Sequence, residues 1–236
     1  MPTETVRLSP SIAKILLDKS PKHAWNAHRL LGGQTKKPSA AQIKGEAVDK
    51  LIFGGEVPKL TKSALEEAEA IAGAVKDALL ARGIFGTAQY RLEWNNGVTD
   101  CSGVVDLFDS TAFKFYELKT THDAGDYNIT KQIEQYRYDV QYAAYVEGLE
   151  EKFPEIDGLQ GSFIFVETSA PYDVRFVNMT PAMLQSGQAA WADACEKWEA
   201  CRRYNDWHGR GDFTADVSGY RKRQETEKWL ADSGIE

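Results

Sequence analysis

The 236-residue sequence has few cysteines and no long apolar run. Its three cysteines are an odd number without a Cys-x-x-Cys pair, which argues against a zinc or iron–sulfur site and fits a reducing compartment. No stretch of about 18 apolar residues occurs, so we expect no membrane span. The first residues lack a basic segment followed by an apolar one, so we expect a cytoplasmic protein that is not exported.

An excess of basic residues is also missing, because the formal net charge is −7. Taken alone, this balance argues against nucleic-acid binding, which usually needs a basic surface. The charge is uneven, however. Residues 1–40 carry seven Lys or Arg against two Asp or Glu, and residues 202–223 carry six against three. Two basic regions beside an acidic centre would reconcile the charge with DNA binding; ordinary solvated surfaces are the alternative.

Hydrophobic residues make up 42% of the sequence and aromatic residues 11%, enough for a well-packed core. The length and the absence of internal repeats or a clear boundary predict one domain over residues 1–236. Within it, we expect N-terminal helices over about 8–82 to pack on the core and a polar C-terminal tail over about 209–236.

Capping residues and apolar periodicity predict the order of the elements. Helices are expected at about 10–19, 21–31, 40–53, 62–82, 129–149 and 181–204, with a short one near 222–230. Strands are expected at 88–94, 103–108 and 112–118 as an antiparallel meander, and then at 162–166 and 174–177, with a polar loop over 120–128. This order predicts an α/β fold with a mixed central sheet flanked by helices.

Two acids and a lysine lie on neighbouring strands of the expected meander. Asp106 interrupts an apolar run, and a buried carboxylate is costly unless it is paired or binds a metal. Glu117 and Lys119 are two residues apart, so they share a face of their strand. Oxygen ligands favour Mg²⁺ or Mn²⁺, and the lysine could orient or deprotonate a water. A solvent-facing aspartate and a surface ion pair are the alternatives.

A polar stripe on the helix over 129–149 is the next candidate. Tyr138, Gln141 and Tyr145 are spaced i, i+3 and i+7 and therefore share one face. The glutamine could hydrogen-bond the attacking water or the lysine, and the tyrosines could contact phosphate or a base. The edge of an ordinary amphipathic helix is the alternative.

A second acidic pair lies on the helix over 40–53. Glu46 and Asp49 are neighbours on one helical face, and either could complete a metal site. The alternative is a surface ion pair between Glu46 and Lys50.

The ordered set of Asp, Glu-x-Lys and Gln-x-x-x-Tyr resembles the PD-(D/E)XK nuclease superfamily. The segments 118–124, 138–145 and 163–172 are similar to its RecE-like (exodeoxyribonuclease VIII) branch, which is often encoded by phages or prophages. The opening Ser9-x-Ser11 and the stretch 201–207 fit the same branch. The resemblance covers about residues 8–208 and implies a restriction-endonuclease-like core.

The resemblance also implies roles for particular residues. Asp106, Glu117 and the Leu118 carbonyl would bind Mg²⁺ or Mn²⁺, with Asp49 as a further ligand. Lys119 would be the catalytic lysine, with Gln141 and Tyr145 as accessory catalytic residues. We expect the DNA contacts at Ser9, Ser11, Lys14 and Tyr138.

One position departs from the family pattern. The opening helix of the family presents Gly-x-x-x-His, and the histidine contacts the metal; here Asp49 follows Gly45 at that spacing. An aspartate can also bind Mg²⁺, but it changes the local charge.

The resemblance implies a metal-dependent exonuclease that degrades double-stranded DNA ends 5′→3′ and leaves 3′ overhangs for recombination. It further implies a homo-oligomeric ring around DNA and a single-strand annealing protein as partner, in the cytosol of a bacterium or a phage-infected host. A non-catalytic DNA-binding or scaffold protein of the same fold and an endonuclease of the same superfamily are the alternatives.

Overall fold

The structure, a computed structural model, describes residues 4–34, 37–156 and 158–212. The expected helix near 222–230 and most of the expected polar tail lie outside these residues.

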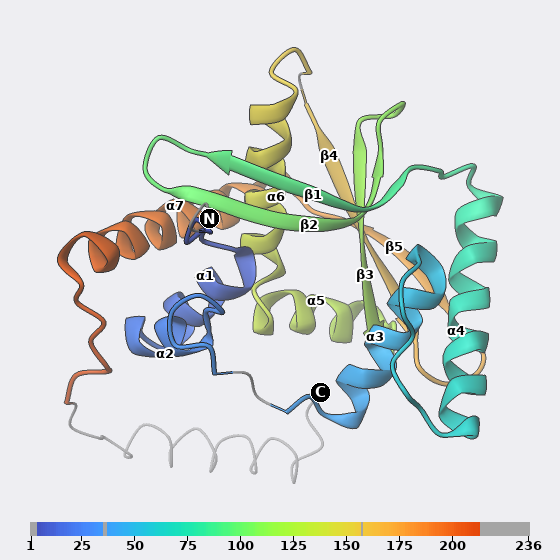
Figure 1. The fold of residues 1–236 in the computed structure, drawn as a ribbon. Helices are drawn as coiled ribbons and strands as arrows, with labels where there is room; N and C mark the ends of the chain where they lie inside the picture. The colour runs from blue at the N-terminus through green and yellow to red at the C-terminus, as the bar shows by residue number, and fades with distance from the viewer. Residues whose placement is uncertain (1–3, 35–36, 157, 213–236) are drawn as a thin grey trace, which may run out of the picture.

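A five-stranded mixed sheet with the order β1-β2-β3-β4-β5 forms the centre of the molecule (Figure 1). Its strands are β1 (Thr87–Asn95), β2 (Asp100–Asp109), β3 (Lys114–Thr121), β4 (Gln160–Glu167) and β5 (Val174–Asn178). β3 and β4 are parallel, and the other neighbouring pairs are antiparallel. The parallel pair requires a long crossover, which two helices supply. The expected α/β fold with a mixed sheet is confirmed.

Seven helices surround this sheet in the described part of the chain. They are α1 (Pro10–Asp18), α2 (Pro21–Ala27), α3 (Ala40–Phe53), α4 (Lys62–Ala81), α5 (Asp126–Gln135), α6 (Tyr138–Lys152) and α7 (Pro181–Tyr204). Five of them begin after a Ser or Thr whose hydroxyl accepts a backbone N–H of the first turn, at Ser9, Ser20, Ser39, Thr61 and Thr180. These caps explain why the starts were predictable from sequence.

The helices form one layer on each side of the sheet (Figure 1). On one side, α1, α6 and α7 cover a core that contains Phe108, Phe163 and Trp198. On the other side, α3 and α4 cover a smaller core around Ile71 and Ile164. None of the helices in residues 4–212 that the structure describes combines the length and apolar character needed to cross a bilayer.

The single helix expected over 129–149 is wrong, because α5 and α6 are separate helices. Arg137 between them has a left-handed backbone, with φ of 50°, which ends one helix and redirects the chain. Its guanidinium forms ion pairs with Asp18 and Asp139. The expected loop over 120–128 is also shorter, since β3 runs through Thr121 and α5 begins at Asp126.

The segment before α1 is fixed to the sheet by backbone hydrogen bonds. The N–H of Leu8 donates to the carbonyl of Asp100 at 2.8 Å, and the N–H of Ser102 donates to the carbonyl of Leu8 at 2.9 Å. Leu8 is fully buried at this bridge. The start of α1 is therefore held beside β2, at the edge of the candidate site.

Candidate active site

The candidate site lies where β2 separates from β3. The backbone pairing of the two strands ends at Leu107 and Tyr116. At the next position the N–H of Asp106 donates to Glu117 Oε1 at 3.1 Å, and the N–H of Leu118 donates to Asp106 Oδ2 at 2.8 Å. Each carboxylate therefore binds the backbone of the opposite strand, and the two acids singled out in the sequence are brought together.

Burial makes this acidic pair electrostatically unfavourable. The Glu117 side chain is only 2% exposed, and Asp106 is partly buried. Burial raises the pKa of Asp106 well above its usual range, and the charge of Glu117 raises it further. Burial also raises the pKa of Glu117, although Lys119 opposes this effect. The two carboxylates therefore need nearby positive charge to neutralise them.

Lys119 supplies part of that charge. Its Nζ lies 3.1 Å from Glu117 Oε2, and its side chain is 13% exposed. Burial lowers the pKa of Lys119, but the charges of Glu117 and Asp106 outweigh burial and leave the pKa above its usual value. Lys119 is therefore an ammonium at neutral pH, so this arrangement favours orientation of a water over its deprotonation.

Gln141 and Tyr145 of α6 join the site through hydrogen bonds. The Gln141 amide donates to Glu117 Oε2 at 2.8 Å and approaches the Tyr145 hydroxyl at 3.2 Å, and this hydroxyl donates to the carbonyl of Val104 at 2.8 Å. The glutamine thus orients the carboxylate rather than the lysine. This position of Tyr145 requires glycine at position 103, because a Cβ there would lie 2.6 Å from the Tyr145 ring.

Asp49 approaches the site from α3. It lines a pocket of about 210 Å³ together with Leu118, Lys119 and Tyr138. Its Oδ2 lies 3.1 Å from Lys50 Nζ, so this lysine pairs with Asp49 and not with Glu46, as the alternative interpretation had it.

Gln89 on β1 is a neighbour of Asp49 that the sequence did not reveal. Its amide Nε2 donates to Oδ1 of Asp49 at 3.2 Å and approaches Oδ2 at 3.4 Å. A glutamine in a strand carries no sequence signal for such a role.

Two lysines lie over the ring of Tyr138. The distance from the ring centre is 4.9 Å to Lys119 Nζ and 5.4 Å to Lys14 Nζ. Burial, together with repulsion from Lys119, lowers the pKa of Lys14 to about 8. Lys14 and Tyr138, both expected from the sequence to bind DNA, are therefore placed beside the acidic pair.

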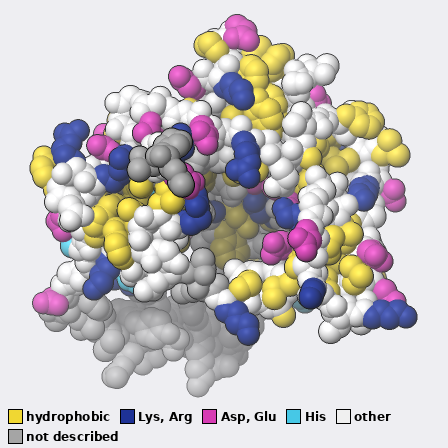
Figure 2. Space-filling view, viewed as in Figure 1, with side chains coloured by type: hydrophobic (Ala, Val, Ile, Leu, Met, Phe, Trp, Pro, Cys, Tyr) yellow, Lys and Arg dark blue, Asp and Glu magenta, His cyan; other side chains and the backbone are white. Residues whose placement is uncertain are grey.

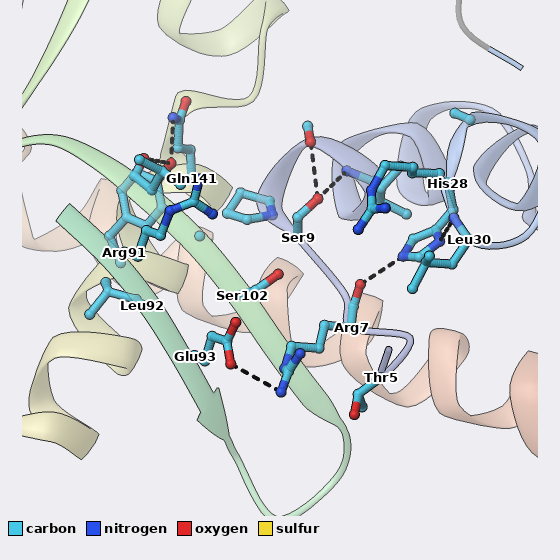
Figure 3. Close-up of a pocket in the computed structure, with 18 of the residues that line it drawn as sticks. Thr5, Arg7, Ser9, His28, Leu30, Arg91, Leu92, Glu93, Ser102 and Gln141 are labelled. Carbon is cyan, nitrogen blue, oxygen red and sulfur yellow. Dashed lines mark hydrogen bonds and ion pairs between the residues drawn. The ribbon is translucent and has the colours of Figure 1, made fainter. Parts of the chain in front are cut away.

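A larger cavity of about 520 Å³ opens on the Gln141 side of the site (Figure 3). Ser9, Ser11 and Lys14 line it, as do Gln141 and Tyr145. The Ser9 hydroxyl caps α1 and lies 3.0 Å from the Ser11 hydroxyl. The two serines singled out in the sequence thus share a cavity with the catalytic candidates.

Arginine side chains make this cavity partly basic. Arg7 is paired with Glu93, whereas exposed Arg91 has no ion-pair partner among the described residues (Figure 3). Lys and Arg side chains also gather around the hollow visible near the centre of Figure 2. Arg91 was not predicted, because a single arginine in an amphipathic strand reads as a surface residue.

The donor atoms of the site fit a hard divalent cation. Asp106 and Glu117 offer two close carboxylates that Lys119 only partly neutralises. Asp49 and Leu118, both named from the sequence, line the adjoining pocket of about 210 Å³. Among the described residues, Asp106 Oδ1 accepts no hydrogen bond from the protein. Within residues 4–212 that are described, no three His, Cys, Asp or Glu side chains are already clustered as a metal site.

Comparisons with known proteins agree with this architecture. A family model described as a PDDEXK-like domain of unknown function (DUF3799) matches residues 59–213. A solved structure from Eubacterium rectale, provisionally described as an exonuclease, is similar with a TM-score of 0.64 and 16% identity, over 90% of this chain and 93% of that one. A phage-related exonuclease from Haemophilus somnus gives 0.44 and 12%, over 86% and 98%. No curated protein matches the sequence.

Proposed function

Since the chain belongs to the family of the PDDEXK-like domain of unknown function, we propose that it is a deoxyribonuclease that depends on a divalent metal ion. One observation carries this proposal: Asp106, Glu117 and Lys119 meet where β2 leaves β3, with Lys119 Nζ 3.1 Å from Glu117. Two buried carboxylates that a single lysine only partly neutralises suit phosphodiester hydrolysis better than they suit folding.

The metal ion would be held by Asp106 and Glu117, with Asp49 and the Leu118 carbonyl as further donors. All of these are oxygen donors, which favour Mg²⁺ or Mn²⁺. When bound, such an ion polarises a phosphate and lowers the pKa of a water.

Lys119 stabilises the charge that develops during the reaction. Its ammonium donates hydrogen bonds to the attacking water or to a phosphate oxygen, where negative charge accumulates. Because the charges of Glu117 and Asp106 hold the pKa of Lys119 above its usual value, Lys119 orients the water rather than accepting its proton. Attack by the water oxygen on phosphorus breaks the P–O3′ bond. The proton of the water passes to solvent and the O3′ leaving group takes up a proton, which gives a 5′-phosphate and a 3′-hydroxyl.

Gln141 and Tyr145 keep Glu117 in one orientation. The amide of Gln141 binds the carboxylate oxygen that also faces Lys119, and Tyr145 limits the movement of that amide. Burial raises the pKa of Tyr145 well above its usual range, so its hydroxyl remains a donor to the carbonyl of Val104.

The DNA strand would pass through the cavity of about 520 Å³ beside these residues. Its phosphates can accept hydrogen bonds from Ser9, which caps α1, from Ser11 and Lys14 on α1, and from Arg91 on β1. The ring of Tyr138 lies beside both Lys14 and Lys119 and could contact the sugar or a base. The local positive charge supports DNA binding despite the net charge of −7.

The finer assignment is a 5′→3′ exonuclease on double-stranded ends that produces 3′ overhangs for recombination. It is supported by the resemblance to RecE-like nucleases and, in fold alone, by the similar structure from Eubacterium rectale. A ring around DNA, which sedimentation velocity would measure, a single-strand annealing partner and a cytosolic location rest on the resemblance in the same way.

The test uses linear duplex DNA labelled at either its 5′ or its 3′ end, incubated with and without Mg²⁺. The wild type should release the 5′ label only with Mg²⁺ and should leave covalently closed circles intact. Lys119→Ala should lower the rate about 10²–10³-fold and should still bind the duplex. The control is Lys114→Ala, at the first residue of β3, and this variant should cleave normally.

Each alternative predicts a different result. Equal cleavage by Lys119→Ala and the wild type would show that this is not the active site. No metal-dependent release of label from any substrate would favour a non-catalytic DNA-binding protein. Cleavage of closed circles would identify an endonuclease.

A further inference from the structure

Gln89 lies opposite Asp106 and has an unusual backbone. The register of β1 and β2 pairs Ala88 with Leu107 and Tyr90 with Val105, which places Gln89 across from the acid. Its φ is +49°, in the left-handed region that side chains other than glycine rarely adopt. Such a conformation persists only where the surrounding contacts impose it, and it is common near functional sites.

The Gln89 side chain makes one set of polar contacts, and these go to Asp49. Nε2 lies 3.2 Å from Oδ1 and 3.4 Å from Oδ2 of the same carboxylate. Gln89 belongs to β1 and Asp49 to α3, so these bonds tie the helix to a strand that is two places from β3 in the sheet. The Asp49 side chain is 21% exposed and faces the pocket shared with Lys119.

A neutral amide suits this position better than a charged partner would. Lys50 already lies 3.1 Å from Asp49 Oδ2 and offsets part of its charge. The amide fixes the direction of the carboxylate without adding positive charge, so the remaining lone pairs of Asp49 stay available for a cation.

We propose that Gln89 is a positioning residue, which fixes the Asp49 carboxylate for the divalent ion at the edge of the Asp106–Glu117 pair. This inference rests on the proposed function. It also gives Asp49 a defined role at the position where related nucleases present a histidine.

The test measures Mn²⁺ binding by isothermal titration calorimetry on the protein without DNA. Gln89→Met keeps the length of the side chain and removes the donor, and it should weaken Mn²⁺ binding about 10-fold, as expected for a residue that orients a ligand. Gln89→Gly also relieves the left-handed backbone and should weaken binding to the same extent. Thr87→Gly, elsewhere on β1, is the control and should bind as the wild type does.

A second comparison asks whether the effect passes through Asp49. In an Asp49→Ala background, Gln89→Met should cause no further loss, because the group that it orients is gone. Circular dichroism of each variant should show an unchanged fold.

The inference fails if Gln89→Met binds Mn²⁺ within twofold of the wild type, or if its effect is equally large in the Asp49→Ala background. In both cases a wild type that binds Mn²⁺ and cleaves DNA leaves the proposed function standing. If the folded wild type binds no Mn²⁺, the proposed function fails and this inference fails with it.

Discussion

At the scale of single residues, the Asp106 carboxylate is kept partly buried beside a second acid. Burial and the charge of Glu117 raise its pKa well above 3.8, its ordinary value. A group whose pKa is raised by folding stabilises the folded state fully below the ordinary pKa, and this contribution is lost as the pH rises through the raised pKa. Without metal, the stability that Asp106 contributes is therefore fully present below about pH 3.8 and is lost as the pH rises through the raised pKa.

Replacing Asp106 with Asn should remove this dependence. The amide oxygen can still accept from the N–H of Leu118, but the variant carries no charge at position 106. In EDTA, the unfolding free energy of the wild type relative to Asp106→Asn should fall as the pH rises from about 3.8. Urea unfolding at a series of pH values measures this difference.

Magnesium provides the control, because a bound cation stabilises the folded form that binds it. At pH 7, Mg²⁺ should raise the stability of the wild type more than that of Asp106→Asn. A stability difference that is the same at every pH would contradict the assignment of a raised pKa to Asp106.

The sequence predicted the candidate site residues but not the partners of all of them. Asp106, Glu117 and Lys119 were predicted because charge in an apolar strand is unusual. The sequence could not distinguish a hydrogen bond from Gln141 to Glu117 from one to a water, because either bond needs only an amide on that face of the helix. The proposed role of Gln89 was not predicted, because it depends on a positive φ and on the strand register, and neither could be read from the sequence pattern.

At the scale of elements, the crossing of α6 and α7 requires a residue without a side chain. A Cβ added to Gly187 would lie 2.3 Å from the carbonyl oxygen of Asp139, and backbone atoms cannot move aside easily. α6 carries Gln141 and Tyr145, so a shift at this crossing would reach the site.

The substitution Gly187→Ala should therefore lower the unfolding free energy by about 1–3 kcal/mol, the usual cost of overpacking. Gly73→Ala on α4 is the matched control, because a Cβ there meets nothing within 4 Å. This control should raise stability by about 0.5–1 kcal/mol, since alanine favours a helix over glycine. Urea unfolding measures the change in unfolding free energy of each variant, and destabilisation by both substitutions would contradict this explanation.

Helix starts were predictable, whereas the break between α5 and α6 was not. Serine or threonine caps mark the starts and act within a few residues. The break depends on Arg137, whose ion pair with Asp18 joins residues far apart in the sequence. A propensity argument favours one continuous helix here because arginine is a good helix former.

At the scale of the whole molecule, an acidic protein presents a basic cavity to its proposed substrate. Arg91 lines this cavity without an ion-pair partner in the described part of the chain. Arg91→Ala should weaken duplex binding in EDTA and reduce the slope of log K against log salt by about 1, as for one lost phosphate contact. Fluorescence anisotropy at several salt concentrations measures the slope.

The control for this measurement is Lys76→Ala, an exposed lysine on α4 outside the cavity. It changes the net charge of the molecule by the same amount and should leave the slope unchanged. Equal slopes for Arg91→Ala and the wild type would place the phosphates elsewhere.

The overall architecture followed from the order of helices and strands, but the location of the positive charge did not. The order of the elements implied a mixed sheet because a long crossover must separate two parallel strands. The basic cavity is assembled from α1 and β1, which are about 80 residues apart (Ser9 and Arg91). Composition showed only that residues 1–40 are basic, and it did not show that they face Arg91.

The separation of β2 from β3 has a practical consequence for mutagenesis. Asp106 and Glu117 each hold a backbone amide of the neighbouring strand, so alanine at either position removes a structural bond along with a charge. Loss of cleavage in such a knockout would mix two causes. An inactive variant for trapping DNA complexes is therefore better made at Lys119. Its side chain is hydrogen-bonded to Glu117, and its removal leaves both carboxylate–backbone bonds between β2 and β3 in place.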